Sequence, residues 1–344
     1  AAVADNSAYK VDTSAPTATI TFSDTALKAG ETTTVTIVFS EAVASFSNTD
    51  LTIQGGSLTP LTSGDNITWT ATFTPTVNLE DATNAISLAT SYTDLAGNTG
   101  TTASSANYAI DTLAPTVLIT DDGGATATGP ITYTFDFSEA VTNFSSDDVS
   151  VTNGTKGSFT AVSSPVYTLV VTPTAGFAGN VTVDVAAATA LDAASNTNTA
   201  ATQSVQAVDT SAPSVSSIAI TSATGALNST LNAGDVVSTT VTFSEAVTVT
   251  GTPQLALNIG GSTVQANYAS GSGTNALSFT YTIVAGQTDA TGISLAANSL
   301  SLNAGTIVDL AGNTATLTTA AVADNSAYKV DTSAPTATIT FSDT

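Results

Sequence analysis

The sequence TVTIVFSEAV, residues 34–43, gives the clearest indication of how this chain folds. Its apolar residues Val35, Ile37 and Phe39 alternate with Thr and Val. A period of two in a run rich in β-branched residues predicts a β-strand that is buried on one face. The strand ends in the string F-S-E-A-V, which returns at Phe137–Val141 and at Phe243–Val247. We therefore expect one β unit to be repeated along the chain.

Two further strings mark the same repeat. The string D-T-x-A-P begins at spacings of 99, 98 and 122 residues, at Asp12, Asp111, Asp209 and Asp331. The string D-x-A-[GS]-N begins at Asp94, Asp192 and Asp309. Because the three strings always follow one another in the same order, they indicate an array of similar domains.

The strings divide the chain into three units, residues 12–110, 111–208 and a longer third unit, 209–330. Residues 1–25 and 320–344 are identical to each other. We therefore expect residues 1–11 to be the last strand of a truncated preceding repeat. By the same argument, residues 331–344 are expected to be the first strand of a truncated following repeat.

Alternating apolar residues recur in each unit, as in Trp69–Phe73, Val181–Val185 and Phe279–Ile283. Gly- and Asn-rich turn signals separate these runs, and no amphipathic helix is evident. Trp69 and the alternating aromatic residues are interpreted as core, with a sugar-stacking platform as the minor alternative. About seven short strands in a unit of this length are typical of a Greek-key sandwich. The predicted fold is all-β, a tandem array of Ig-like Greek-key β-sandwich domains in an elongated rod.

The composition excludes several functions. The 344 residues include no Cys and no His, and the net charge is -23. Four basic residues cannot neutralise a run of phosphates, so nucleic acid is excluded as a partner, and an anionic membrane surface is equally disfavoured. No apolar run is long enough for membrane insertion. The lack of His and Cys removes catalytic triads, thiolate catalysis and most transition-metal sites. The remaining oxygen ligands suit calcium.

The topology of a sandwich predicts where the acidic residues meet. The linker Asp, the Glu of F-S-E-A-V and the Asp of D-x-A-[GS]-N all fall at the pole of a domain that faces the preceding one. Nearby Asn side chains are expected to add amide oxygens. The predicted groups are Asp12/Glu41/Asp94 with Asn98, Asp111/Glu139/Asp192 with Asn196, and Asp209/Glu245/Asp309 with Asn313.

Three carboxylates at one pole repel one another unless they splay apart or bind a cation. Calcium accepts six to eight oxygens in irregular geometry, so we predict Ca²⁺ at each group. Asp24 is expected to approach Asp111, and Asp121 or Asp122 to approach Asp209, from the domain before. Weaker candidates are Glu80 and Asp81 at the same far pole, and Asp50 and Asp148. The alternative interpretation is that these acids form ordinary turns and a solvated surface.

The strings VDTxAP, FSEAV and DLAGN, in units of about 100 residues, resemble the bacterial Ig-like repeats of giant calcium-dependent surface adhesins. That resemblance covers the whole chain and implies an RTX-adhesin or biofilm-associated protein, exported by type I secretion. It also implies an extracellular or cell-surface extender region with calcium at the junctions. Unit 2 departs from the pattern, because Ser195 replaces the Gly of the last string.

The leading hypothesis is a structural stalk that carries a distal binding domain away from the cell. Its partners are calcium and the neighbouring repeats of the same chain, and it is expected to be a monomeric rod. Each unit adds on the order of 40 Å, judged from the size of a compact domain. The alternative is a module in the longer third unit that binds a sugar, ice or a host protein. An enzyme is not expected, because the acids recur at equivalent positions in every unit.

Overall fold

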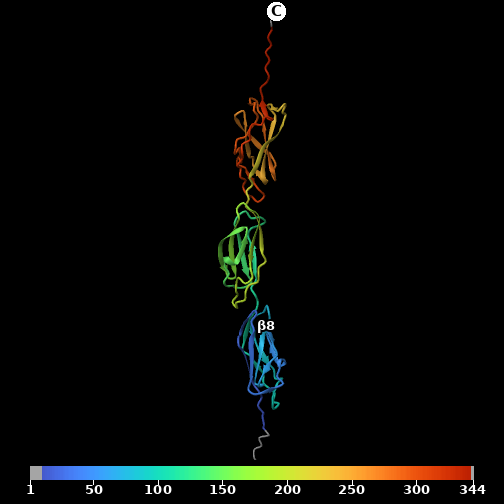
Figure 1. Ribbon diagram of the computed structural model, residues 1–344, viewed down its shortest axis with the longest axis vertical. Helices are drawn as coiled ribbons and strands as arrows, with labels where there is room; N and C mark the ends of the chain where they lie inside the picture. Colours follow the sequence, from blue (N-terminus) through green and yellow to red (C-terminus); the bar gives the residue numbers. More distant parts are fainter. Residues whose placement is uncertain (1–9, 342–344) are drawn as a thin grey trace, which may run out of the picture.

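The computed structural model describes residues 10–341 and places three β-sandwich domains in line (Figure 1). We call them repeats 1, 2 and 3, and each has its own buried hydrophobic core. The predicted fold class is therefore confirmed. Among the described residues, no helix has the length and hydropathy needed to cross a membrane.

Repeat 1 packs one continuous sheet against a second, broken one. The order of the first is β1-β3-β8-β6, with β7 also paired to β8. Its strands are β1 (Ala18–Phe22), β3 (Thr33–Phe39), β6 (Gly56–Leu58), β7 (Thr62–Ser63) and β8 (Thr68–Pro75). The opposite layer consists of the paths β12-β10-β5 and β2-β13-β9 and the pair β11-β4. These strands are β2 (Ala26–Lys28), β4 (Val43–Ala44), β5 (Leu51–Ile53), β9 (Glu80–Asn84), β10 (Ile86–Leu88), β11 (Thr93–Asp94), β12 (Ala103–Ser104) and β13 (Tyr108–Asp111).

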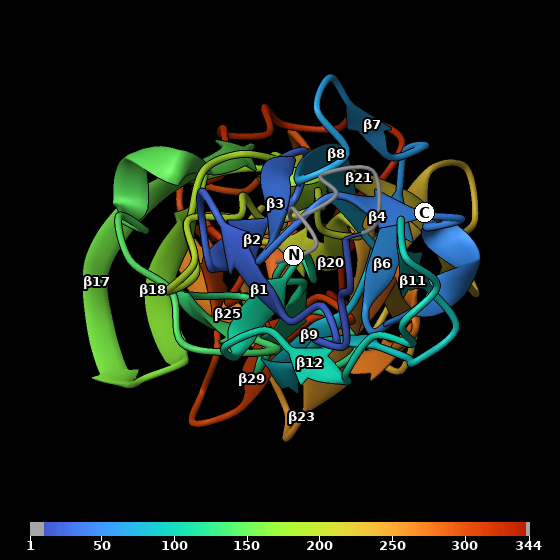
Figure 2. The same cartoon turned by 90° about the horizontal axis from the view of Figure 1, so that it is seen from below.

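Repeat 2 has the same plan with longer, less interrupted strands. Its first sheet has the order β14-β15-β18-β17 and its second the order β16-β19-β20. The strands are β14 (Val117–Asp121), β15 (Ile131–Phe137), β16 (Val149–Thr152), β17 (Gly154–Ser163), β18 (Val166–Pro173), β19 (Ala178–Val185) and β20 (Ser204–Asp209). Viewed along the rod, the β17–β18 hairpin projects to one side of the molecule (Figure 2).

Repeat 3 uses its extra residues to lengthen strands. The main sheet runs β21-β23-β26-β25-β24-β28, and β22, β30 and β27 form a second sheet. The strands are β21 (Val215–Thr224), β22 (Thr230–Leu231), β23 (Val236–Thr250), β24 (Gln254–Ile259), β25 (Ser262–Ser270), β26 (Thr274–Thr282), β27 (Thr288–Asp289), β28 (Leu300–Ser301), β29 (Thr306–Val308) and β30 (Lys329–Asp331). β23 is 15 residues long and also pairs with β29, whereas its counterpart β3 has seven residues.

The predicted alternation of apolar and polar residues determines which side chains of each strand lie in the core. Along β3, the side chains of Val35, Ile37 and Phe39 are buried, and the intervening Val38 is exposed. The ring of Phe39 lies 4.9 Å from that of Phe46 in edge-to-face geometry, and Phe137 contacts Phe144 in the same way. Each such ring removes enough apolar surface from water to stabilise the fold by roughly 1.5–3 kcal/mol. In repeats 1 and 2 this ring pairing holds the strand in its core, and Phe243 of repeat 3 is also buried.

The identical terminal segments adopt different structures. Lys329–Asp331 forms β30 between β22 and β27, and Val330 is 2% exposed. The same three residues at Lys10–Asp12 form no strand, and Val11 is 89% exposed. Residues 332–341, whose assignment to a truncated following repeat stays a prediction, likewise contain no strand. The reason is that a strand needs a neighbouring strand to pair its backbone groups, and these segments have none. The rest of the predicted strand 1–11 lies outside the described residues.

The two copies of this valine provide a matched test. Val330→Ala removes buried methyl groups and is expected to lower the unfolding free energy of repeat 3 by about 2 kcal/mol. Val11→Ala changes an exposed side chain and should shift stability by less than about 0.5 kcal/mol. Denaturant unfolding followed by circular dichroism measures both. Equal effects of the two substitutions would contradict the assignment of β30 to the core of repeat 3.

Candidate metal centre

The structure brings the three predicted acidic groups together. In each group one carboxylate oxygen per residue lies within 4.8 Å of the others. The groups, here named triplets 1, 2 and 3, are Asp12/Glu41/Asp94, Asp111/Glu139/Asp192 and Asp209/Glu245/Asp309. Triplet 2 lies at the junction of repeats 1 and 2, and triplet 3 at that of repeats 2 and 3. The members come from three distant segments, so the fold alone produces the clusters.

A short strand pairing positions the Glu beside the Asp of the D-x-A-[GS]-N loop. In repeat 1, Val43 of β4 pairs with Asp94 of β11. The equivalent pairs are Thr142 with Leu191 in repeat 2 and Thr248 with Val308 in repeat 3. Because each pair lies within three residues of its Glu and Asp, the distance between the two carboxylates is set by the sheet.

The D-x-A-[GS]-N loop turns its Asp inward. One carboxylate oxygen of Asp94 accepts the backbone N–H of Asn98 at 2.8 Å, and the same bond is 2.7 Å long in Asp192 and 2.8 Å long in Asp309. These three aspartates are only 2–3% exposed. Gly97 adopts a φ of +92°, and Ser195 in repeat 2 adopts a φ of +71°. The loop shape is therefore kept without the Gly, at the cost of a left-handed Ser.

The asparagines of these loops differ from expectation. They were expected to offer amide oxygens, but the structure turns their amide nitrogens toward the triplets. The Nδ2 of Asn196 donates to Asp192 Oδ2 at 2.8 Å and to the Asp111 carbonyl at 2.9 Å. Asn98 and Asn313 make the equivalent pairs of bonds. They act as positioning residues, which tie the loop of each repeat to its linker.

Two hydroxyl residues that the sequence analysis did not single out clamp the linker at both ends. The Thr112 hydroxyl donates to the Thr76 carbonyl at 2.7 Å and accepts from the Leu79 N–H, which holds the linker to repeat 1. The Ser138 hydroxyl accepts the Thr116 N–H at 3.0 Å, and the Ser138 N–H donates to the Thr116 carbonyl, which holds it to repeat 2.

The same pair of clamps recurs with Thr210 and Ser244 at the next linker. Both residues belong to the repeated strings D-T-x-A-P and F-S-E-A-V, so their repetition was the signal that could have identified them.

The preceding repeat contributes a different acidic residue from the one expected. Glu80 of β9 pairs in register with Asp111 of β13 and is one of the charges that act on Glu139. Asp24 was expected in this place, but its carboxylate caps the turn at Ala26 N–H. At the next junction the residue paired with Asp209 is Ala178, which brings no charge.

The other acidic candidates have structural partners. Asp121 accepts the Gly123 N–H and the Ser204 hydroxyl, and Asp122 accepts the Thr132 N–H. Asp50 and Asp148 close capping boxes at the 3-10 turns η1 (Asn48–Asp50) and η2 (Ser146–Asp148). Among the described residues, none of these four joins an acidic group of three.

The triplets carry uncompensated negative charge. Burial raises the pKa of Glu139, and the charges of Asp192, Asp111 and Glu80 raise it further. The pKa values of Glu41 and Glu245 are raised in the same way, by burial and then by the two aspartates of each triplet. Burial would raise the pKa of Asp94 too, but hydrogen bonds from Asn98 and the loop N–H groups outweigh it and lower that pKa. Within residues 10–341 the one ion pair joins Lys28 to Glu31, so no lysine neutralises a triplet.

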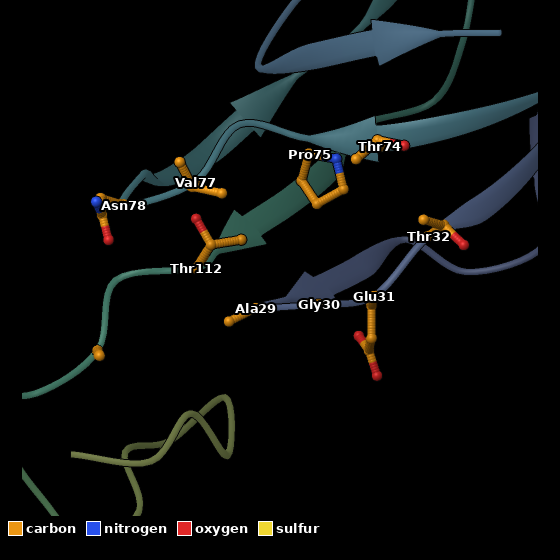
Figure 3. A pocket seen from close by; sticks show the side chains of 10 residues that line it. Ala29, Gly30, Glu31, Thr32, Thr74, Pro75, Val77, Asn78 and Thr112 are labelled. Carbon is orange, nitrogen blue, oxygen red and sulfur yellow. The ribbon is translucent and has the colours of Figure 1, made fainter. Parts of the chain in front are cut away.

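The first junction has a direct hydrogen bond between repeats, and no bond of that kind joins repeats 2 and 3 among the described residues. The Ala29 N–H of repeat 1 donates to Asn196 Oδ1 of repeat 2 at 2.8 Å. A cavity of about 320 Å³ lies beside it, between the Ala29–Thr32 turn and the linker at Thr112 (Figure 3). The Thr112 hydroxyl is already used by the clamp, and Glu31 pairs with Lys28, which leaves Thr32, Thr74 and Asn78 as the other polar side chains of the lining. We interpret it as a gap in the junction.

The raised pKa values predict an unusual pH dependence in calcium-free protein. A Glu whose folded pKa lies above its unfolded value opposes folding when ionised, so stability should rise as pH falls from 7.5 toward 4.5. The lowered pKa of Asp94 has the opposite effect on stability. Its contribution to folding is lost only when the pH falls below 3.8, toward the lowered pKa of the folded state. Thermal unfolding in excess chelator measures the trend. In the triple variant Glu41→Gln/Glu139→Gln/Glu245→Gln, the melting temperature should depend less on pH. An unchanged pH dependence would contradict its assignment to the three triplet glutamates.

The unequal contacts predict unequal stiffness. Asn196→Ala removes a hydrogen bond between repeats, whereas Asn313→Ala removes only bonds within repeat 3 and its linker. Because the chain has no Cys, spin labels can be attached to cysteines introduced at the exposed Thr72, Thr172 and Thr282. Pulsed electron paramagnetic resonance should show a broader 72–172 distance distribution after Asn196→Ala. Asn313→Ala should broaden the 172–282 distribution less, and equal broadening would contradict this account.

Comparison with solved structures finds adhesins of low similarity. The Escherichia coli adhesin FdeC is 14% identical, with a TM-score of 0.31, over 91% of this chain and 96% of that one. The Yersinia pseudotuberculosis adhesin InvE is 17% identical, with a TM-score of 0.25, over 56% and 58%. Invasin, a bacterial integrin-binding protein, is 12% identical, with a TM-score of 0.29, over 81% and 56%.

No curated protein matches the chain in sequence. A family match is nevertheless found, to the bacterial Ig-like domain, over residues 12–110 and again over residues 111–208. The two matched segments make up more than half of the 344 residues. On this evidence the chain belongs to the family of bacterial Ig-like domains.

Proposed function

We propose that this chain is a structural extender segment of a large bacterial cell-surface adhesin, and that calcium ions at the triplets stiffen it. The observation that carries the proposal is the recurrence of one carboxylate triplet at the linker end of every repeat. Acidic residues that were only solvated would not need to meet at the same place in all three repeats, each time from three distant segments. The resemblance to RTX adhesins supplies the finer form of the proposal, which is an extracellular stalk exported by type I secretion in a biofilm-associated protein.

The donor set suits a hard cation. Each triplet offers a Glu carboxylate that accepts no hydrogen bond from the described residues, and a linker Asp that uses one oxygen in its own turn, as Asp111 does with the Leu113 N–H. The buried Asp of the loop is held by its Asn and is oriented before any ion arrives. Calcium accepts such mixed carboxylates together with carbonyls and water. The ion would join the linker Asp to the two carboxylates of the following repeat, and so add to the clamps on either side.

The second triplet has a further property. Glu80 belongs to repeat 1 and adds its negative charge to that of Glu139 and Asp192 in repeat 2, so a cation there would be attracted by both domains, although Glu80 lies outside the triplet. At the third triplet, the preceding repeat supplies Ala178 in the place of Glu80. We therefore propose that calcium stiffens the first junction more than the second. The proposed role is structural.

Calcium titration of the full chain by isothermal calorimetry tests the proposal. We expect three sites, with dissociation constants of about 10⁻⁴–10⁻³ M, as in extracellular modules. Glu139→Gln/Asp192→Asn removes two ligands from triplet 2 and should remove one site. Asp136→Asn/Asp147→Asn removes the same charge from exposed positions of repeat 2 and should remove none. The proposal fails if the parent chain binds no calcium at 10 mM (roughly tenfold above the weakest expected constant), or if both double variants bind alike.

A further inference from the structure

In each repeat a segment near the start runs beside the last strand, in the same direction. In repeat 1, β2 pairs in parallel with β13 over three residue pairs. In repeat 3, β22 pairs in parallel with β30 over two residue pairs. Repeat 2 has a single parallel bridge in this place, between Ala127 and Val208. We call these the terminal pairings of the three repeats, because they join the segments through which the chain enters and leaves each domain.

Each terminal pairing is part of a hydrophobic core. Leu27 of β2 is paired with Ile110 of β13, and both side chains are at most 2% exposed. Leu231 has the same place in repeat 3 and is fully buried. In repeat 2 the place of these leucines is taken by Ala127, opposite Val208, so its terminal pairing buries less apolar surface.

The sequence explains why the terminal pairing of repeat 2 is short. Residues 124–128 read GATAT, where residues 24–28 of repeat 1 read DTALK. Gly124 adopts a φ of +62°, which lies outside the β region and ends the pairing there. Two backbone hydrogen bonds of 2.9 Å remain at Ala127, to the Ala207 carbonyl and from the Asp209 N–H. The Gln206 amide adds one side-chain bond, to the Gly124 carbonyl at 2.9 Å.

The direction of the terminal pairings determines how a repeat responds to tension along the rod. The chain enters repeat 1 through β1 and β2, and it leaves through β13 toward repeat 2 (Figure 1). Tension on the two ends therefore pulls β2 and β13 in opposite directions along their own length. Backbone hydrogen bonds of a sheet run from strand to strand, so this load strains all bonds of the terminal pairing together. Unfolding from the ends then requires the whole pairing to break at once.

We propose that the terminal pairings bear tension along the rod, and that repeat 2, which has the weakest one, is the first repeat to yield. Its unfolding releases chain length under load while repeats 1 and 3 stay folded. The proposed stalk role supplies the source of the tension. The pairings themselves belong to single domains and need no calcium, so measurements in excess chelator test them even if the triplets bind no ion.

Optical tweezers that stretch the full chain between its two ends, in excess chelator, test the proposal. Three unfolding events are expected, and the first should come from repeat 2. At constant force repeat 2 should unfold at least about fivefold faster than repeat 1, because each backbone hydrogen bond missing from the pairing changes the rate by about that factor. The event of repeat 3 is recognised by its length, since residues 209–330 release more chain than either other repeat.

A disulfide assigns the first event to repeat 2. The chain has no Cys, and paired residues of neighbouring strands lie close enough for a disulfide. In Ala127→Cys/Val208→Cys without free thiols, the first event should lose most of its length, because residues 128–207 are then shielded from the load. Reductant should restore it. Leu27→Cys/Ile110→Cys should shorten a later event instead, and a shortened first event in that control would overturn the proposal.

Two variants of repeat 1 separate the terminal pairing from general stability. Ala109→Pro removes the N–H that donates to the Thr25 carbonyl at 2.8 Å. Leu88→Ala empties part of the core at β10, which is not paired with β2 or β13. Denaturant unfolding gives the stability that each variant loses. Ala109→Pro should speed unfolding of repeat 1 under force at least about fivefold, and more than Leu88→Ala does. Rates under force that follow the lost stability alone would refute the load-bearing role.

Discussion

The geometry of this molecule depends on how the two linkers between its repeats are held. A Thr hydroxyl ties the start of the linker to the repeat before it, and a Ser hydroxyl with its own N–H ties the end to the repeat after it. An Asn amide then joins the linker carbonyl to the buried Asp of the next repeat. These are ordinary hydrogen bonds, each contributing about 1 kcal/mol. Together they leave the linker little freedom, so the direction of one repeat largely determines that of the next.

The carboxylate triplets are a consequence of this arrangement. Fixing the linker Asp, the strand end that carries Glu139 and the loop that carries Asp192 brings three negative charges together at the junction. Nothing positive in the described part of the chain offsets them. Because the folded chain holds these repelling charges together at every repeat, a cation bound there would stabilise it. The triplet and the clamps therefore serve one proposed purpose, which is to control the angle between repeats.

Much of the fold and of the triplets could be predicted from the sequence, because the three repeats can be compared with one another. Alternation around Val35, Ile37 and Phe39 predicted the strands, and the order of three strings predicted which acids would meet. The Asn role was mistaken because spacing cannot tell which end of an amide faces a carboxylate. Glu80 was only a weak candidate, since its place opposite Asp111 depends on strand register. The binding role considered for repeat 3 stays a prediction. Its extra residues lengthen β21, β23 and β24 relative to β14, β15 and β16.

The duplicated terminal segment shows the limit of local prediction. Val11 and Val330 have the same neighbours in sequence, yet one is exposed and the other lies in a core. Ile20 and Ile339 differ in the same way. Strand propensity is equal in both copies, so the difference comes entirely from whether a partner strand is present. A strand predicted from its own residues therefore forms only where a partner strand of the same domain lies beside it.

Small-angle X-ray scattering of the full chain, in millimolar calcium and then in excess chelator at neutral pH, measures whether a cation stiffens the junctions. In calcium we expect a stiff rod, with the repeats in line. In chelator the cross-section should be unchanged, because the cores stay folded, but the longest distances should be lost as the junctions bend. Identical profiles in the two conditions would contradict the claim that a cation completes the junctions, and would leave the hydrogen-bonded clamps as the only source of stiffness.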